Sequence, residues 1–199
     1  MLKLLLASQN AGKLRELQAI LQELPIQLVA PAALNLNLDV EETGKTYAEN
    51  AALKSKAFSN ASGLIALGDD SGLEVDALNG APGLYSARYA PTPNATDGDR
   101  RAYLLKNLLP HSRPWTARFR ATIAITTLSD ETYFAEGACE GEIIPEERGE
   151  GGFGYDPIFY IPELGCTMAE LDEEKKNRIS HRARALEKAK EILKTLMGK

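Results

Sequence analysis

Short apolar runs alternate with amphipathic stretches along the chain, and this alternation predicts the order of its strands and helices. Residues 4–7 and 64–67 are continuously apolar, which is typical of strands buried within a sheet. Residues 119–128 and 132–139 have the composition of strands, and the three polar residues between them predict a hairpin. Residues 158–161 predict one further strand.

Helices are predicted between and after these strands. Leucines recur at helical spacing after the first strand, and Pro25 should end that helix. Capping patterns at Thr46 and Thr96 predict helices to about residues 60 and 109, and a last amphipathic helix begins near Ser180. A further capping box begins at Thr167. Strands and helices that alternate at both ends, with a hairpin between them, indicate a mixed α/β fold.

Composition narrows the class of protein. A chain of 199 residues with 44% hydrophobic side chains can form one domain with a substantial core, so we expect a single domain over residues 1–199. Its net charge of −5 argues against a general binder of nucleic acid or anionic membranes. The apolar start is too short to span a membrane and lacks a signal cleavage site, so we expect a cytoplasmic protein.

Two segments match nucleotide-binding patterns without the context that those patterns require. Gly44-Lys45-Thr46 ends like a P-loop, but Asp39 stands where the first glycine is needed. Residues 149–154 fit the pattern G-x-G-x-x-G, but Pro157 and a predicted strand follow in place of a helix. We interpret the second segment as a flexible loop, whose glycines and neighbouring aromatic rings could still bind a flat ligand.

Residues 8–13 connect the first strand to the first helix. The amides at a helix start and the cation of Lys13 would together form a phosphate cradle. Alternatively, Ser8 or Asn10 only caps the helix and Lys13 is solvated. This segment alone slightly favours that alternative.

Two carboxylates, Asp69 and Asp70, directly follow the second buried strand. Ligands in open α/β sheets bind beyond the carboxyl ends of strands, so these residues predict a metal site or a general base. An acidic turn is the alternative. Glu41 and Glu42 add carboxylates before the next helix, on which Lys54 follows.

Residues 175–182 concentrate four cations and a histidine near the predicted start of the last helix. Cations oppose the dipole at a helix N-terminus, which suggests that this cluster binds an anion, with a solvated surface as the alternative. Together with the other segments, it indicates a magnesium-dependent reaction on a nucleotide phosphate.

Seven blocks of sequence stand in order and resemble one family. They are Ser8-x-Asn10-x-x-Lys13, Glu41–Gly44, Glu49-Asn50-Ala51-x-x-Lys54, Asp69–Leu73, Gly80–Arg88, Gly152–Pro157 and Ser180–Arg182. Over residues 3–190 the chain resembles the inosine triphosphatase family, the noncanonical purine nucleoside triphosphate pyrophosphatases also called Ham1-like or RdgB-like proteins. Ser8 stands where threonine is commoner in the family and keeps the hydroxyl.

The resemblance implies an elongated mixed β-sheet flanked by helices, with two lobes and a central nucleotide-binding cleft. It also implies a homodimer that uses Mg²⁺ to hydrolyse dITP, ITP and XTP or dXTP to the monophosphate and pyrophosphate. Such an enzyme cleanses the nucleotide pool and prevents incorporation of these bases into DNA and RNA. We expect no nucleic-acid or membrane partner.

The resemblance further implies a role for each site residue. Glu41 and Asp70 would hold the metal; Asp70 would also be the base for the attacking water, and Lys54 would neutralise phosphate charge. The remaining residues would bind the substrate: Ser8, Gln9, Asn10, Ala11, Gly12, Lys13, Ser71, Phe153, Gly154, Tyr155, Asp156, Lys176, His181 and Arg182.

Base selection follows from the hydrogen-bonding groups of the purine. We expect Arg182 to donate to O6, Asp156 to accept from N1–H, and Phe153 to stack on the ring. Adenine would leave both polar groups unpaired, at roughly 1–3 kcal/mol each. Alternatively, Asp156 fixes the glycine-rich segment of residues 149–154, the glycine loop, and Arg182 binds phosphate.

Two other functions compete with this one. A Maf-like nucleotide pyrophosphatase shares the general architecture, but the blocks at residues 152–156 and 180–182 argue against it. A nucleotide-binding sensor without turnover is disfavoured by the acidic pair and by Lys13 and Lys54.

Overall fold

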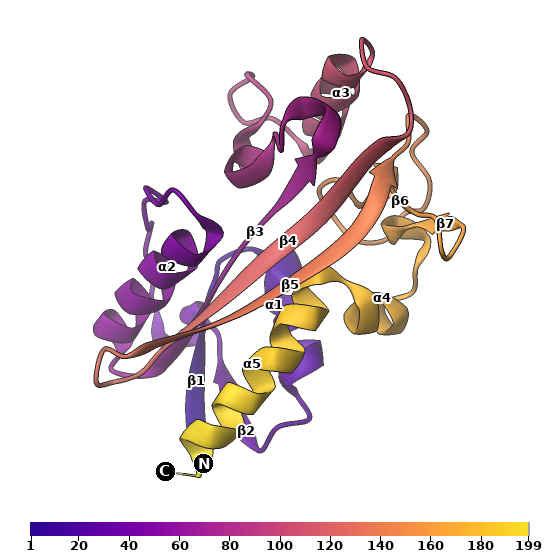
Figure 1. The fold of residues 1–199 in the computed structure, drawn as a ribbon. Helices are drawn as coiled ribbons and strands as arrows, with labels where there is room; N and C mark the ends of the chain where they lie inside the picture. Colours follow the sequence, from indigo (N-terminus) through magenta and orange to yellow (C-terminus); the bar gives the residue numbers. More distant parts are fainter. Residues whose placement is uncertain (199) are drawn as a thin grey trace. The chain divides into compact units, whose positions relative to one another are not determined.

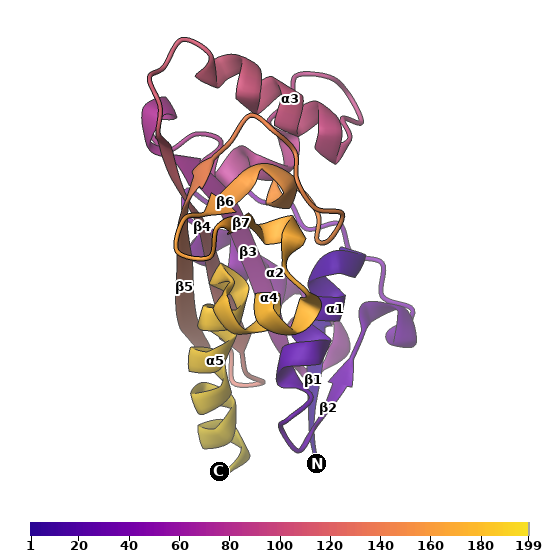
Figure 2. The same cartoon turned by 90° about the vertical axis from the view of Figure 1, so that its right-hand side faces the viewer.

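The structure, a computed structural model, describes residues 1–198 as a mixed α/β fold (Figures 1 and 2). The strands are β1 (Leu2–Ala7), β2 (Ile26–Val29), β3 (Ile65–Val75), β4 (Trp115–Thr126), β5 (Thr132–Ile143), β6 (Phe159–Ile161) and β7 (Cys166–Thr167). The α-helices are α1 (Ala11–Leu21), α2 (Tyr47–Ser62), α3 (Asp97–Leu108), α4 (Glu173–Ile179) and α5 (His181–Met197). No helix of the described residues is long and apolar enough to span a membrane.

The strands form one mixed sheet in the order β2-β1-β3-β4-β5-β6-β7. Strand β1 pairs in parallel with β2 and β3, whereas β6 pairs antiparallel with β5 and β7. The predicted α/β class is therefore confirmed, and so is the adjacency of the two hairpin strands, β4 and β5.

The chain divides into two compact units. The first contains Met1–Asp70, Ala121–Gly137 and the chain from His181 onward; the second contains Ser71–Arg120 and Ala138–Ser180. Strands β3, β4 and β5 contribute residues to both units.

The first unit buries β1 on both of its faces, as its continuous apolar run predicts. Leu4 and Leu6 belong to a cluster with apolar side chains of α1 and α5. Leu5 and Ala7 belong to a second cluster that includes Phe58 of α2. Helices α1 and α5 are in contact, and α2 lies on the opposite face of the strand (Figures 1 and 2).

The second unit has a core of its own. Phe119 of β4 and Phe159 of β6 are stacked at a tilt, with ring centroids 4.5 Å apart. Leu104 and Leu108, the buried residues of α3, belong to the same cluster. The predicted capping box at Thr96 is present: its hydroxyl accepts from the Asp99 N–H, and the Asp99 carboxylate accepts from the Thr96 N–H.

Helix α1 ends at Leu21, ahead of Pro25, as the sequence predicts. The predicted end of the second buried strand was wrong. Strand β3 does not end before Asp69 but continues to Val75. Its pairing with β1 stops at Gly68, opposite Ala7, while β4 remains its neighbour in the sheet.

Candidate functional site

The segment between β1 and α1 is built around a cap. The Asn10 side chain accepts a hydrogen bond from the Lys13 N–H at 3.0 Å, and Ser8 Oγ accepts from the Asn10 N–H at 3.2 Å. Ala11 and Gly12 occupy the first turn, where amides have no intrahelical acceptor. The capping alternative is thus confirmed for Asn10, and the amides of this turn remain suited to an anion.

Gln9 and Lys13 connect this segment to two other parts of the chain, residues 37–38 and Asp69. Gln9 Nε2 donates to Asn37 Oδ1 at 2.9 Å and to the Leu38 carbonyl at 3.2 Å. Lys13 Nζ lies 3.4 Å from both the Asp69 carboxylate and the Asp69 carbonyl. Burial lowers the pKa of Lys13, and the charge of Asp69 opposes that effect. Lys13 is therefore directed at an acidic partner and is not merely solvated.

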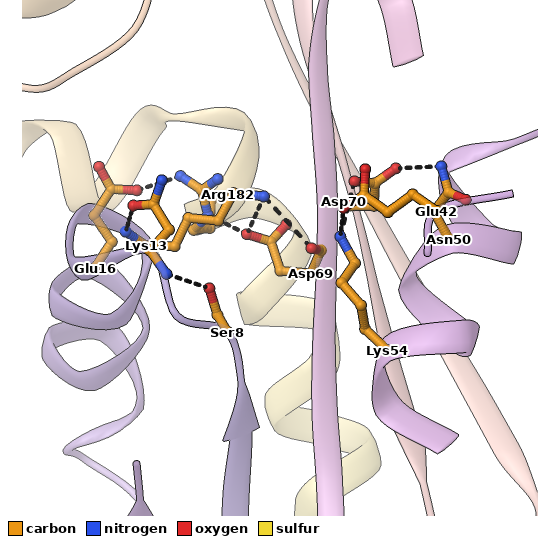
Figure 3. A network of polar contacts seen from close by, with 10 residues as sticks. Ser8, Lys13, Glu16, Glu42, Asn50, Lys54, Asp69, Asp70 and Arg182 are labelled. Atoms are coloured by element: carbon orange, nitrogen blue, oxygen red, sulfur yellow. Dashed lines mark hydrogen bonds and ion pairs between the residues drawn. The ribbon is translucent and has the colours of Figure 1, made fainter. Parts of the chain in front are cut away.

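Asp69 joins a buried network with α1 and α5 (Figure 3). Arg182 Nε donates to Asp69 Oδ2 at 2.8 Å, and Arg182 also pairs with Glu16. The side chains of Asp69 and Arg182 are 0% and 1% exposed. Burial would raise the pKa of Asp69, but Arg182 and Lys13 hold it well below its ordinary value. Asp69 is therefore a fixed anion whose second oxygen, Oδ1, is buried and accepts no hydrogen bond from residues 1–198.

Asp70 enters a different network on the α2 side (Figure 3). Asn50 donates to Asp70 Oδ2 at 3.2 Å, and Lys54 Nζ lies 3.0 Å from Asp70 Oδ1. Lys54 Nζ also lies 2.9 Å from Glu42 Oε1. Successive side chains of a strand point to opposite faces, and Figure 3 shows the two aspartates on opposite sides of β3. Asp69 and Asp70, adjacent in the sequence, therefore belong to two separate networks.

The environment of Asp70 suits a proton acceptor. Burial raises the pKa of Asp70, and the positive charges of Lys54 and Lys13 act in the opposite direction. Burial would lower the pKa of Lys54, but Asp70 and Glu42 raise it, so the lysine stays charged. The arrangement combines a carboxylate with raised proton affinity and a fixed cation at contact distance.

Gly68 allows α2 to approach β3 closely enough for this pairing. A Cβ atom at residue 68 would lie 2.2 Å from the Ala51 carbonyl oxygen and 2.9 Å from the Ser55 amide nitrogen, both in the backbone of α2. Asn50 also accepts from the Gly44 N–H at 2.8 Å, which fixes the segment that carries Glu42. The positions of Asn50 and Lys54 beside Asp70 thus follow from a glycine that precedes the two aspartates.

The carboxylate oxygens of Asp70 and Glu42 on the α2 side are donors of the kind that a divalent cation binds. Glu42 is the carboxylate that reaches Lys54, whereas Glu41 is exposed. Within the described part of the chain, no group of three or more acidic, histidine or cysteine side chains could hold a metal.

In the second unit, Asp156 fixes the glycine loop. Asp156 Oδ2 accepts from the Phe153 N–H at 2.9 Å and lies 2.7 Å from Lys176 Nζ. Gly152 has a φ of +72°, and a Cβ atom there would lie 2.0 Å from the same oxygen. The alternative role expected for Asp156, holding this loop, is therefore present in the structure.

Lys176 lies against this loop from α4. Its ammonium is 4.9 Å from the centroid of the Phe153 ring, within the range of a cation–π contact. The predicted conflict between this cation cluster and a helix dipole was wrong for residues 175–178, because α4 is a separate helix. Lys176 and Arg178 lie in its last turn, where cations are favourable.

Tyr155 is hydrogen-bonded to the block at residues 80–88. The Tyr155 hydroxyl donates to the Ser86 carbonyl at 2.9 Å, and burial raises the pKa of Tyr155, so it remains a neutral donor. Ser86 Oγ accepts from the Leu73 N–H at 2.9 Å and donates to the Gly83 carbonyl at 2.6 Å. This block therefore ties the glycine loop to β3 within the second unit, a role that the sequence did not indicate.

The two remaining candidates lie near unit boundaries. Ser71 is the half-buried residue of β3 that follows Asp70. His181 is buried and begins α5 in the first unit. A Cβ atom at Gly137 would lie 2.2 Å from the His181 carbonyl, so this glycine allows the first turn of α5 to pack on β5.

A mixed α/β fold in which a helix starts directly after a parallel strand, together with Lys13 and the Lys54–Asp70 pair, is suited to bind a phosphorylated ligand. The chain belongs to the Ham1 family, whose profile matches residues 4–192. The family predicted from the seven sequence blocks is thus confirmed.

Relatives are similar over nearly their whole length. The dITP/XTP pyrophosphatase of Desulforamulus reducens is 51% identical over 197 residues, which cover 98% of this chain and 97% of the relative. The dITP/XTP pyrophosphatase of Geobacter sulfurreducens is 48% identical over 195 residues, which cover 97% of each.

Solved structures agree with this assignment. A HAM1 protein from Coxiella burnetii has a TM-score of 0.89 and 44% identity, with coverage of 98% of this chain and 100% of that chain. The Ham1 protein of Staphylococcus aureus has a TM-score of 0.85 and 41% identity, with coverage of 97% and 98%.

Proposed function

We propose that this protein hydrolyses noncanonical purine nucleoside triphosphates, namely dITP, ITP and XTP, to the monophosphate and pyrophosphate. The observation that carries the proposal is Asp70, a buried carboxylate of raised pKa held at 3.0 Å from the charged Lys54. Family membership and the names of the relatives from Desulforamulus reducens and Geobacter sulfurreducens support the substrate class. We also propose that it acts in the cytoplasm as a homodimer on free nucleotides, without a nucleic-acid partner.

The reaction that these residues support is attack by water on the α-phosphorus. A bond forms between the water oxygen and that phosphorus, the bond to the bridging oxygen of pyrophosphate breaks, and Asp70 accepts the water proton. Lys54, Lys13 and the amides at the start of α1 would stabilise the negative charge that develops on the phosphates. The other residues assigned to substrate contact in the segment 8–13 and Ser71 keep that proposed role.

Bound Mg²⁺ would neutralise phosphate charge and orient the reacting groups. Asp70 and Glu41 are the proposed ligands from the family resemblance, and the position of Glu42 beside Lys54 makes it a third candidate. Each offers the oxygen donors that this cation prefers.

Purified protein should release pyrophosphate from ITP only with a divalent cation present, and more rapidly as the pH rises. The base must be ionised to accept a proton, and burial raises the pKa of Asp70, so activity should fall on acidification at a higher pH than for an exposed aspartate. The measurement is pyrophosphate release from ITP, dITP, XTP, dGTP, ATP and dTTP with Mg²⁺, repeated in excess chelator and across pH.

Three other outcomes of this assay would contradict the proposed function or its metal requirement. Full turnover in excess chelator would contradict the metal requirement. Tight binding of ITP without pyrophosphate release would identify a sensor, and preference for dTTP would identify an enzyme of the Maf-like class.

Asp156→Asn should lower the preference for ITP over ATP by at least about tenfold in kcat/KM. We propose that Phe153, Asp156 and Lys176 recognise the base, and the substitution removes the carboxylate that holds the other two. Asp172→Asn is the matched control, because Asp172 caps α4 from an exposed position and contacts Lys175. A preference that stays unchanged in Asp156→Asn would assign base recognition to other residues, including the proposed His181 and Arg182.

A further inference from the structure

Two charged residues near the start of α3 hold the glycine loop at one residue, Gly154. Asp97 Oδ2 accepts from the Gly154 N–H at 2.7 Å, and Arg101 donates to the Gly154 carbonyl at 2.8 Å. Arg101 also forms a two-pronged pair with Glu147, with Nε–Oε1 and Nη2–Oε2 distances of 2.8 and 2.9 Å. Both hydrogen-bonding groups of Gly154 are therefore fixed by charged side chains from a helix.

The loop needs such anchors because of its backbone. Gly152 and Gly154 have φ values of +72° and +63°, and they flank Phe153 on either side. Glycine populates many backbone conformations at little cost, so its sequence alone does not fix the direction of the ring between them. Beyond the adjacent residues, no heavy atom of residues 1–198 lies within 4 Å of an ideal Cβ at Gly154, so side-chain packing at this position does not restrain the loop.

Charged anchors supply the missing restraint. Hydrogen bonds in which one partner is ionised are about twice as strong as neutral ones. The side chain of Arg101 is 15% exposed, so it is held by Glu147 and the loop together and is not extended into solvent. The Phe153 N–H is held separately by Asp156, so the peptides on both sides of the ring are restrained by different elements.

We propose that Asp97 and Arg101 are positioning residues for base recognition, which fix the Gly154 peptide and thereby the direction in which Phe153 presents its ring. The proposal rests on the proposed function, in which Phe153 stacks on the purine. Neither residue needs to contact the substrate, because each acts through the backbone of the loop.

The test compares Asp97→Ala with Asp99→Ala, two substitutions in the same turn of α3. Asp99 accepts from Thr96 to close the capping box, with no contact to Gly154 among its hydrogen bonds. Loosening of the helix start is common to both variants, whereas loss of the loop anchor belongs to Asp97→Ala alone. Arg100, which pairs with Asp97, retains the carbonyls of Ala87 and Ala95 as acceptors.

We expect Asp97→Ala to raise KM for ITP about tenfold, the effect of one lost hydrogen bond to an ionised group, with kcat changed less than about threefold. The ITP-to-ATP ratio of kcat/KM should fall, while inhibition by pyrophosphate, which lacks a base, should stay the same. Asp97→Asn, which keeps an oxygen acceptor, should recover most of the lost preference. Asp99→Ala should resemble the wild type in KM, in kcat, in the ITP-to-ATP ratio and in inhibition by pyrophosphate.

Amide hydrogen exchange provides a readout that is independent of activity. The amide of Gly154 should exchange at least about tenfold faster in Asp97→Ala than in the wild type or in Asp99→Ala, because a lost hydrogen bond lowers the free energy of local opening. Equal exchange in the two alanine variants, or an equal loss of ITP and ATP hydrolysis in Asp97→Ala, would overturn the inference. A wild-type protein that releases no pyrophosphate would instead overturn the proposed function on which it rests.

Discussion

Asp70→Asn is expected to lower turnover of ITP at least ~100-fold, the lower end of general acid–base contributions, while the protein remains folded. Asparagine keeps the shape of the side chain but cannot accept the proton of the attacking water, and it removes the negative charge beside Lys54. Because burial already disfavours the charged form of Asp70, a neutral side chain at this position should cost little stability.

Glu74→Gln is the matched control for this substitution. It removes one negative charge from the same strand, β3, where Glu74 pairs with the partly exposed Arg120. Pyrophosphate release gives kcat for both variants, and thermal unfolding checks that both are folded. Near-normal turnover by a folded Asp70→Asn variant would assign the base to another carboxylate, with Asp69, Glu41 and Glu42 as the next candidates.

Arg182→Ala is expected to lower the free energy of unfolding by about 3–5 kcal/mol, because it leaves buried carboxylates without their cation. Asp69 and Glu16 both pair with this guanidinium, whose side chain is 1% exposed. In the structure this guanidinium pairs with two acidic side chains, and its contact with the substrate stays a prediction.

The unfolding free energy that Arg182→Ala loses should be smaller at low pH than at neutral pH. In the wild type the pKa of Asp69 is lowered on folding, so its contribution to stability is present at neutral pH and is lost as the pH falls. Without Arg182, burial would raise that pKa and the variant would favour a protonated Asp69. The difference in unfolding free energy between wild type and variant should therefore narrow as the pH falls below about 4, the ordinary pKa of an aspartate.

Lys194→Ala provides the comparison within the same helix. Lys194 pairs with Glu191 three residues earlier, and the two side chains are 54% and 71% exposed. Exposed pairs of this kind contribute about 0–1 kcal/mol, so urea unfolding should separate the two variants clearly. An Arg182→Ala variant that unfolds with the same free energy as Lys194→Ala would contradict the structural role of this arginine.

The sequence correctly predicted elements that are fixed by neighbouring residues, such as a helix that begins at a capping pattern. Thr96 was predicted to cap a helix, and its hydroxyl and Asp99 form the complete capping box. The course of β3 was not predicted, because Asp-Asp-Ser-Gly has the composition of a turn, whereas pairing with a neighbouring strand overrides that preference.

The partners of the predicted site residues depend on tertiary structure and were largely missed. Glu16, which pairs with Arg182, is separated from it by 166 positions and appears in the sequence only as a polar residue of an amphipathic helix. Nothing in the sequence indicated Asp97 and Arg101 as partners of Gly154 either, because they lie more than fifty positions before it. The resemblance to a family indicated the residues expected at the ligand but not those that hold them in place.

The contact between α2 and β3 at Gly68 sets the distance between these two elements, whereas other residues supply the reactive groups of the candidate site. Asp70, Lys54 and Asn50 supply the charges and hydrogen bonds, but the distance across which they act is set by backbone resting on backbone. A substitution of Asp70 or Lys54 should therefore change the charge of the site and leave the distance between α2 and β3 unchanged. A side chain at residue 68 would instead separate α2 from β3, so the spacing of the site depends on a residue that has no reactive atom.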